Sequence, residues 1–166
     1  MNDLPIGLLF TILGLLLLFS AFFSSSETGM LSLNRYRLKH LANEGHRSAK
    51  LAKHLLETPE RLISVILIGN NLVNIAAATI ATIIAQQLMP NNEELALALS
   101  TISLTLVVLI FSEVTPKTLA QRHPERISFP ASYVLRVLSV VLAPAVWLVN
   151  NIVKSIFWLF RVGHGG

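Results

Sequence analysis

Clusters of oxygen-bearing side chains interrupt the long apolar stretches of this sequence, at the spacing of one helix face. In the first stretch, Ser20, Ser24 and Glu27 follow an i, i+4, i+7 pattern, and in the second Asn70 and Asn74 lie at i and i+4. Side chains at these spacings project from one side of a helix. Each set therefore presents its oxygens to one neighbouring helix or to one cavity.

A third cluster closes the next apolar stretch, with the sequence Ser112-Glu113-Val114-Thr115-Pro116-Lys117. Proline has no backbone N–H, and its ring clashes with the carbonyl four residues earlier. We therefore expect the Ser112 carbonyl to be released there, to bind an ion or water. Carboxylate, amide, hydroxyl and carbonyl oxygens without a thiolate suit a hard cation such as Mg²⁺. Na⁺ could use the same oxygens, so the residues alone leave the selectivity open.

Each cluster also has a purely structural explanation. Ser24 and Glu27 match the S-x-x-E capping box, which would begin a helix at that point. Glu113 and Lys117, at i and i+4, could form a simple ion pair. The two asparagines could hydrogen-bond between helices, as asparagine often does in membranes. These alternatives stay open at the level of the sequence.

The segments that position the clusters are apolar enough to cross a bilayer. The chain has 166 residues, of which 53% are hydrophobic and only 13% charged, against about 25% charged in soluble domains. Uncharged runs near the ~20 residues needed for a spanning helix predict an all-α integral membrane fold with transmembrane helices at about 4–34, 60–89 and 95–119. A cleaved signal peptide is disfavoured, because no Lys or Arg precedes the first run.

Two further segments are predicted to lie at the membrane surface. Residues 35–58 mix leucines with cations and are expected to form amphipathic juxtamembrane helices. The stretch 127–162 is interrupted by Arg136, Pro144 and Lys154. Its tryptophans and cations favour an interfacial helical belt, although a crossing of the membrane stays open.

The basic residues predict the orientation of the chain. Lys and Arg gather between the first and second spans and after the third, whereas the N-terminus and the link 90–94 have none. Because basic loops stay in the cytoplasm, we expect a multi-pass protein of the cell (plasma or inner) membrane with its N-terminus outside and its C-terminus cytoplasmic. The cations then face the lipid bilayer, and no nucleic-acid partner is expected.

Enzymatic chemistry has little support in the sequence. The absence of cysteine excludes a thiolate nucleophile and a disulfide framework. The histidines fall outside the predicted spans and no H-E-x-x-H motif occurs, so we expect no enzyme. The competing function is a membrane anchor and dimerisation scaffold for a cytoplasmic regulatory domain. Such an anchor has no need for polar clusters on all three spans.

The chain carries three motifs in the order and spacing of a known family: Phe23-Ser24-Ser25-Ser26-Glu27-Thr28, Gly69-Asn70-Asn71-Leu72-Val73-Asn74 and Ser112-Glu113-Val114-Thr115-Pro116-Lys117. Together they resemble the transmembrane domain of the CorC/CNNM magnesium transporters, and the resemblance covers essentially the whole of residues 1–166. It implies a homodimer that exports Mg²⁺ in exchange for Na⁺. It also implies three spans per protomer, cytoplasmic juxtamembrane helices and an in-plane 127–162 stretch.

By position, the resemblance implies a metal site on the first serine of the first motif, on two asparagines and on the glutamate before the proline: Ser24, Asn70, Asn74 and Glu113. Second choices are Ser26, Gly69, Ser112 and Pro116. Glu27 is a weaker candidate, because some relatives lack an acid there. The family usually continues into CBS domains that bind ATP and a further small domain. The sequence stops at Gly166 with neither, so we expect it to belong to a longer protein.

Overall fold

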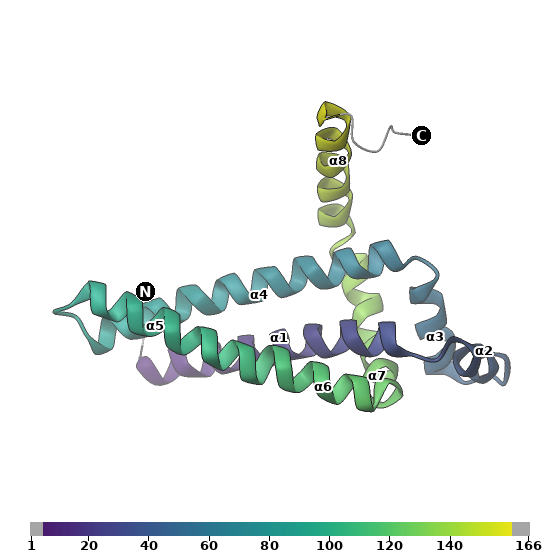
Figure 1. Cartoon of the computed structure of the whole chain (residues 1–166), viewed down its shortest axis with the longest axis horizontal. Coiled ribbons are helices and arrows are strands. Elements are labelled where there is room, and N and C mark those ends of the chain that lie inside the picture. Colours follow the sequence, from purple (N-terminus) through teal and green to yellow (C-terminus); the bar gives the residue numbers. More distant parts are fainter. Residues whose placement is uncertain (1–4, 161–166) are drawn as a thin grey trace.

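The computed structural model describes residues 5–160, and every regular element in that range is a helix. Three long helical units lie side by side along the long axis of the molecule (Figure 1). They are α1 (Ile6–Ser32), α4 (Pro59–Leu88) and a third unit made of α5 (Glu93–Val107), the π-helical segment η1 (Val108–Val114) and α6 (Thr115–Arg122). The predicted all-α membrane fold is confirmed.

The long helices have the length and surface of membrane spans. α1 has 27 residues and α4 has 30, more than the ~20 needed to cross the hydrocarbon, so both protrude or tilt. Their outer faces expose large apolar side chains such as Leu18, Leu72 and, on the third unit, Phe111. A surface of this kind suits lipid acyl chains as its solvent.

The antiparallel pair α1–α4 forms the centre of the bundle through two apolar clusters. Leu9 packs with Ile83 and Ile84 near the α4–α5 turn. Toward the other end, Phe23 packs in a larger cluster with Ile66. Between the two clusters, the middle of the α1–α4 pair is lined by other side chains.

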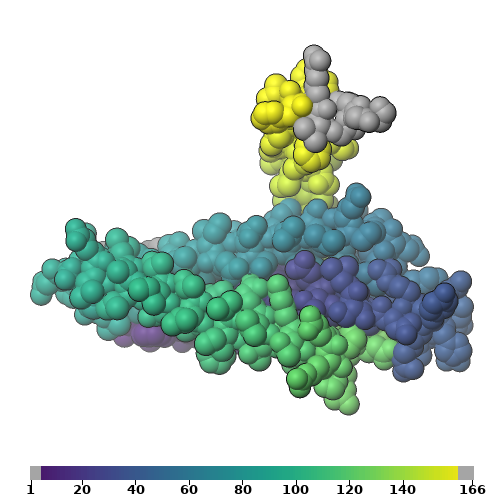
Figure 2. All heavy atoms as spheres, viewed as in Figure 1, coloured from purple at the N-terminus to yellow at the C-terminus, as the bar shows by residue number. Residues whose placement is uncertain are grey.

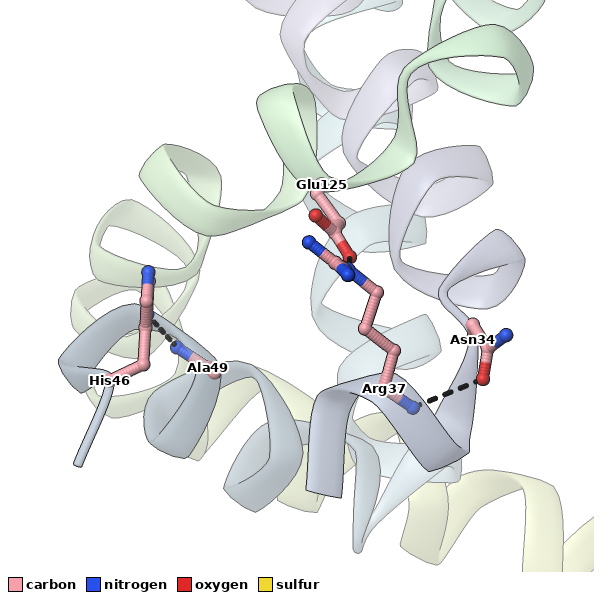
Figure 3. Close-up of polar contacts among 5 residues, drawn as sticks. All are labelled: Asn34, Arg37, His46, Ala49 and Glu125. Carbon is pink, nitrogen blue, oxygen red and sulfur yellow. Dashed lines mark hydrogen bonds and ion pairs between the residues drawn. The ribbon is translucent and has the colours of Figure 1, made fainter. Parts of the chain in front are cut away.

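Two short helices, α2 (Arg35–Asn43) and α3 (Arg47–Leu56), occupy the predicted juxtamembrane segment. The Asn34 side chain accepts from the Arg37 backbone N–H and caps α2, and His46 caps α3 in the same way (Figure 3). The Arg37 guanidinium also pairs with Glu125 of α7 (Pro124–Val141) (Figure 3). This ion pair ties the α2–α3 hairpin to the C-terminal part of the chain.

Helix α7 crosses the last turns of α1 and the first turns of α4. At the α1 crossing, a Cβ added to Gly29 would lie 2.7 Å from Ser128 Oγ. At the α4 crossing, the Arg61 guanidinium donates to the Ser139 carbonyl at 3.2 Å. Helix α8 (Ala143–Phe160) then projects from the bundle, across the direction of the long helices (Figures 1 and 2).

The described part of the chain has one more candidate span than the three that were predicted. Within residues 5–160, four helical units are long and apolar enough to cross a membrane, and the fourth is α8, with 18 residues and a mean hydropathy of 1.3. The stretch 127–162 divides at Leu142, between α7 and α8, so the expected interruption lies beside Pro144. Pro144 itself is in the first turn of α8, where a missing N–H costs nothing. The transverse direction of α8 (Figure 1) is nevertheless the one that an in-plane helix would have. Its interfacial position stays a prediction.

Replacing Gly69 should weaken the α1–α4 pair. A Cβ at this position would lie 2.5 Å from Cζ of the buried Phe23 ring. We expect Gly69→Ala to destabilise the domain by about 1–3 kcal/mol, as overpacking does, measured by denaturant unfolding in detergent. Gly14→Ala is the matched control, since nothing lies within 4 Å of its added Cβ. Equal stabilities of the two variants would contradict the close contact.

Candidate ion-binding site between the spans

The middle of the α1–α4 pair is polar. Ser20 Oγ lies 2.8 Å from Asn74 Oδ1 and 3.1 Å from Asn70 Oδ1. Ser20 is fully buried, and both asparagines are half-buried. All three residues lie near the midpoints of their helices, between the two apolar clusters. We call them the central polar layer, and in a spanning bundle this layer lies close to the midplane of the bilayer.

At the centre of this polar layer, two amide oxygens face one hydroxyl. The single proton of the Ser20 hydroxyl serves one amide oxygen at a time. In the amide orientations of the structure, both Oδ1 atoms face that hydroxyl. One amide oxygen is therefore left without a donor in this contact. A cation placed here would satisfy both amide oxygens together, as hard cations do with carbonyl oxygens.

Ser24 extends the layer by one helical turn toward the α2 end. Its side chain is 2% exposed, and its Oγ has no hydrogen-bond partner among the described residues. A buried hydroxyl without a partner costs about 1–3 kcal/mol, and a helical serine can normally avoid that cost by bonding to the carbonyl four residues earlier. Because Ser20 and Ser24 share a face of α1, this unpaired hydroxyl belongs to the same strip of oxygens.

The third span reaches α1 through η1. Ser112 is fully buried, and its Oγ donates to the Leu17 carbonyl at 3.1 Å, one turn before Ser20 on α1. Near Ser112, where the sequence predicts a released carbonyl, the helix continues through a wide π-helical turn without a break. Pro116 follows it inside the continuous third unit, so its missing N–H leaves the preceding turn one donor short. Such π-helical segments are rare and often occur at functional sites.

Glu113 forms an ion pair with Lys117, as one interpretation of their i, i+4 spacing predicted. Its Oε2 lies 3.3 Å from Lys117 Nζ, and the carboxylate is half-buried. Among residues 5–160, no three His, Cys, Asp or Glu side chains converge on one point. Neutral oxygens would thus supply most of the ligands to a cation at the central polar layer. Glu113 follows directly after Ser112, the residue that reaches α1.

Two of the predicted site residues have other surroundings. Ser26 is buried, with its Oγ unpaired among the described residues. It lies on the face of α1 that carries Gly29 and Met30, which contact α7. Gly69 adjoins Asn70 in sequence, but its position is taken up by close contact with the Phe23 ring. The structure therefore does not bring Ser26 into the central polar layer, and the role of Gly69 that it records is packing.

The capping-box interpretation is wrong, because α1 runs without interruption from Ile6 to Ser32, through Ser24 and the half-buried Glu27. The sequence reasoning also left Ser20 out of the candidate site, although Ser20 makes the observed bonds to both asparagines. A second omission is Ser128, whose Oγ is buried and unpaired within the described chain. Its signal was the spacing of Ser128 and Ser132 at i and i+4 in α7.

An apolar cavity of about 370 Å³ lies between the three spans, on the side of the α4–α5 turn. It extends from Phe10 and Met89 to Leu17 and Val107. It therefore reaches Leu17, whose carbonyl accepts the hydrogen bond from Ser112. Its walls are almost entirely aliphatic. The cavity offers space beside the central polar layer but few oxygens of its own.

Comparisons with known proteins agree with this architecture. The family model of the cyclin M transmembrane N-terminal domain, CNNM, matches residues 11–166. The inner membrane protein YfjD of Escherichia coli is 48% identical over 143 residues, 86% of this chain and 33% of that protein. A UPF0053 protein of Haemophilus influenzae is also 48% identical, over 94% of this chain and 36% of its own length. A polyamine export protein of Haemophilus influenzae is 31% identical over 89% of this chain and 36% of its own length.

The chain thus spans about a third of the length of these relatives. The match to the family model covers nearly all of the chain, including the three spans and the crossing helix α7. The relatives include proteins named for export and for the inner membrane. This chain is a multi-pass membrane domain that belongs to the CNNM transmembrane-domain family.

Proposed function

We propose that this domain exports Mg²⁺ across the cell membrane in exchange for Na⁺, through the central polar layer. The observation that supports the proposal is the pair of amide oxygens directed at one buried hydroxyl in the middle of the spans. Polar groups in hydrocarbon are costly unless they are satisfied. Interhelical hydrogen bonds return only about 0.6 kcal/mol each. Transport sites commonly lie near the midplane, where a bound ion compensates the exposed oxygens.

The proposed site suits an ion that must be released again. Mg²⁺ dehydrates reluctantly and keeps several waters, so a few amide and hydroxyl oxygens can hold it without a dedicated cage. The unpaired hydroxyl of Ser24 continues the oxygens toward the α2 end. On the opposite side lies the aliphatic cavity. Access to the layer from one side at a time would then require movement of α1 or of the third span.

A polyamine is the second candidate cargo. Relatives from Haemophilus influenzae and Salmonella typhimurium, 31% and 29% identical, are named polyamine export proteins. A polyamine is a chain of ammonium donors, and an amide oxygen accepts from an ammonium as readily as it binds a metal ion. The two cargoes differ in shape and hydration. Flux measured with each cation separates them.

The proposed assembly follows the family resemblance. We place the N-terminus outside, the α2–α3 hairpin and the C-terminus in the cytoplasm, and two protomers in a homodimer. The greater length of the relatives supports further cytoplasmic domains, CBS domains among them, in the whole protein. The alternative function is a membrane anchor and dimerisation scaffold for those domains.

Asn74→Ala should reduce Mg²⁺ flux in proteoliposomes at least about tenfold, as loss of a metal-site group does. Ser25→Ala is the control on the facing helix, because the Ser25 hydroxyl donates to the Phe22 carbonyl of its own helix. Ser24→Ala should behave like Asn74→Ala. An anchor would support no Mg²⁺ flux, with or without the substitutions. The polyamine would be favoured if the unsubstituted protein carried spermidine but no Mg²⁺, and if the substitutions abolished the spermidine flux.

The roles of Glu113 and Lys117 can be separated by substituting each alone. If the carboxylate serves the ion, Glu113→Gln should abolish Na⁺-dependent Mg²⁺ efflux. Lys117→Gln should then preserve or raise that efflux, because it frees the carboxylate from its partner 3.3 Å away. Equal, mild effects of both substitutions would mean that the pair is only structural.

The orientation can be tested by cysteine labelling without background, because the chain has no cysteine. Asn91→Cys, at the exposed α4–α5 turn, should react with an impermeant maleimide in intact cells. Lys39→Cys, exposed on α2, should react only after the cells are permeabilised. The reverse pattern would invert the topology and the assigned direction of transport.

A further inference from the structure

A second polar site lies outside the spans, where α3 meets α7. A cavity of about 550 Å³ is lined there by the following residues: Arg47, Lys50, Leu51, His54, Tyr133 and Arg136. Three of them carry permanent positive charge, and none is acidic. The composition points to an anion as the ligand.

The positive charge of this cavity is not neutralised by the protein. Arg47, Lys50 and Arg136 make no ion pair with any residue from 5 to 160. His54, the fourth basic side chain of the lining, lies beside Glu57, with 3.7 Å between its Nδ1 and Glu57 Oε2. Three cations that border one cavity repel one another. A bound anion relieves that repulsion, and a phosphate offers enough oxygens for all three.

The walls of the cavity are held together from both helices. Ser48 Oγ and Tyr133 Oη are 2.9 Å apart and form a hydrogen bond between α3 and α7. Beneath them, Ala49 and Ala52 of α3 and Leu135 of α7 are fully buried in the same apolar cluster. The cations are therefore carried by a fixed helix pair and not by a loop.

The neighbouring surface of α7 indicates which kind of phosphate binds. Tyr133, Arg136, Val137 and Val140 recur at i, i+3, i+4 and i+7, so they share one face of the helix. Val137 is 59% exposed and Val140 is 70% exposed. Cations and exposed valines on one strip are typical of a helix at the lipid interface, with the charges at phosphate depth. The depth fits, because α7 crosses the ends of α1 and α4.

We propose that the α3–α7 cavity binds the phosphate of an anionic phospholipid headgroup, with the exposed valines of α7 against its acyl chains. Arg47, Lys50 and Arg136 are the phosphate ligands. This site is separate from the central polar layer and does not depend on which cation is transported.

Native mass spectrometry of the purified chain, with phosphatidylglycerol or phosphatidylcholine added to the detergent, tests the proposal. We expect selective retention of phosphatidylglycerol. Arg136→Gln and Lys50→Gln should each weaken the binding of phosphatidylglycerol about fivefold, which is the contribution of one cation near a membrane surface. Arg136→Lys keeps the charge and should retain most of the affinity. Lys39→Gln removes the same charge from exposed α2, outside the cavity, and should change nothing.

Equal retention of the two lipids would overturn the proposal. An equal loss in Lys39→Gln would also overturn it, because the attraction would then be diffuse. Displacement of phosphatidylglycerol by inorganic phosphate would overturn the lipid assignment in favour of a soluble phosphate ligand. The variants change exposed side chains only, and unchanged helical circular dichroism would show that they fold.

Discussion

Amide and hydroxyl oxygens at the centre of an apolar helix pair must find partners without water, and this constraint organises the rest of the molecule. Ser20 satisfies it only in part, with one proton for two asparagine oxygens. The apolar clusters on either side hold α1 and α4 in register, so the oxygens stay opposite one another. Gly69 admits the Phe23 ring directly beside this layer. Packing and polar chemistry are therefore adjacent along the same two helices.

The simple structural explanations and the transport proposal are compatible in this geometry. The asparagines do bond across helices, and Glu113 does pair with Lys117. What these bonds leave over is a second amide acceptor and the unpaired, buried hydroxyl of Ser24. A domain that only anchored its partner would gain stability by filling those positions with aliphatic side chains. The proposed transport site would explain why these oxygens are present despite their cost in stability.

Helical spacing predicted which residues share a face, because α-helical geometry determines this directly, and the all-α membrane fold followed from hydropathy. Spacing does not determine depth or pairing across helices. The choice of Ser24 came from its position in the family motif, which does not include Ser20, the residue that makes the observed bonds. The π-helical turn before Pro116 leaves no periodic signature in seven residues. Pro144 does mark a boundary, the one between α7 and α8, but the sequence does not show on which side of the proline the second helix begins.

The wide turn of η1 contains one residue more than an α-helical turn of the same height. Each residue turns an α-helix by about 100°, so the extra residue offsets the faces of α5 and α6 by about that angle from those of an uninterrupted α-helix. Ser112 and Glu113 lie within the segment, whereas the extramembrane ends of the span lie beyond it. Residues before and after η1 that α-helical spacing would place on one face therefore point to different sides of the third span.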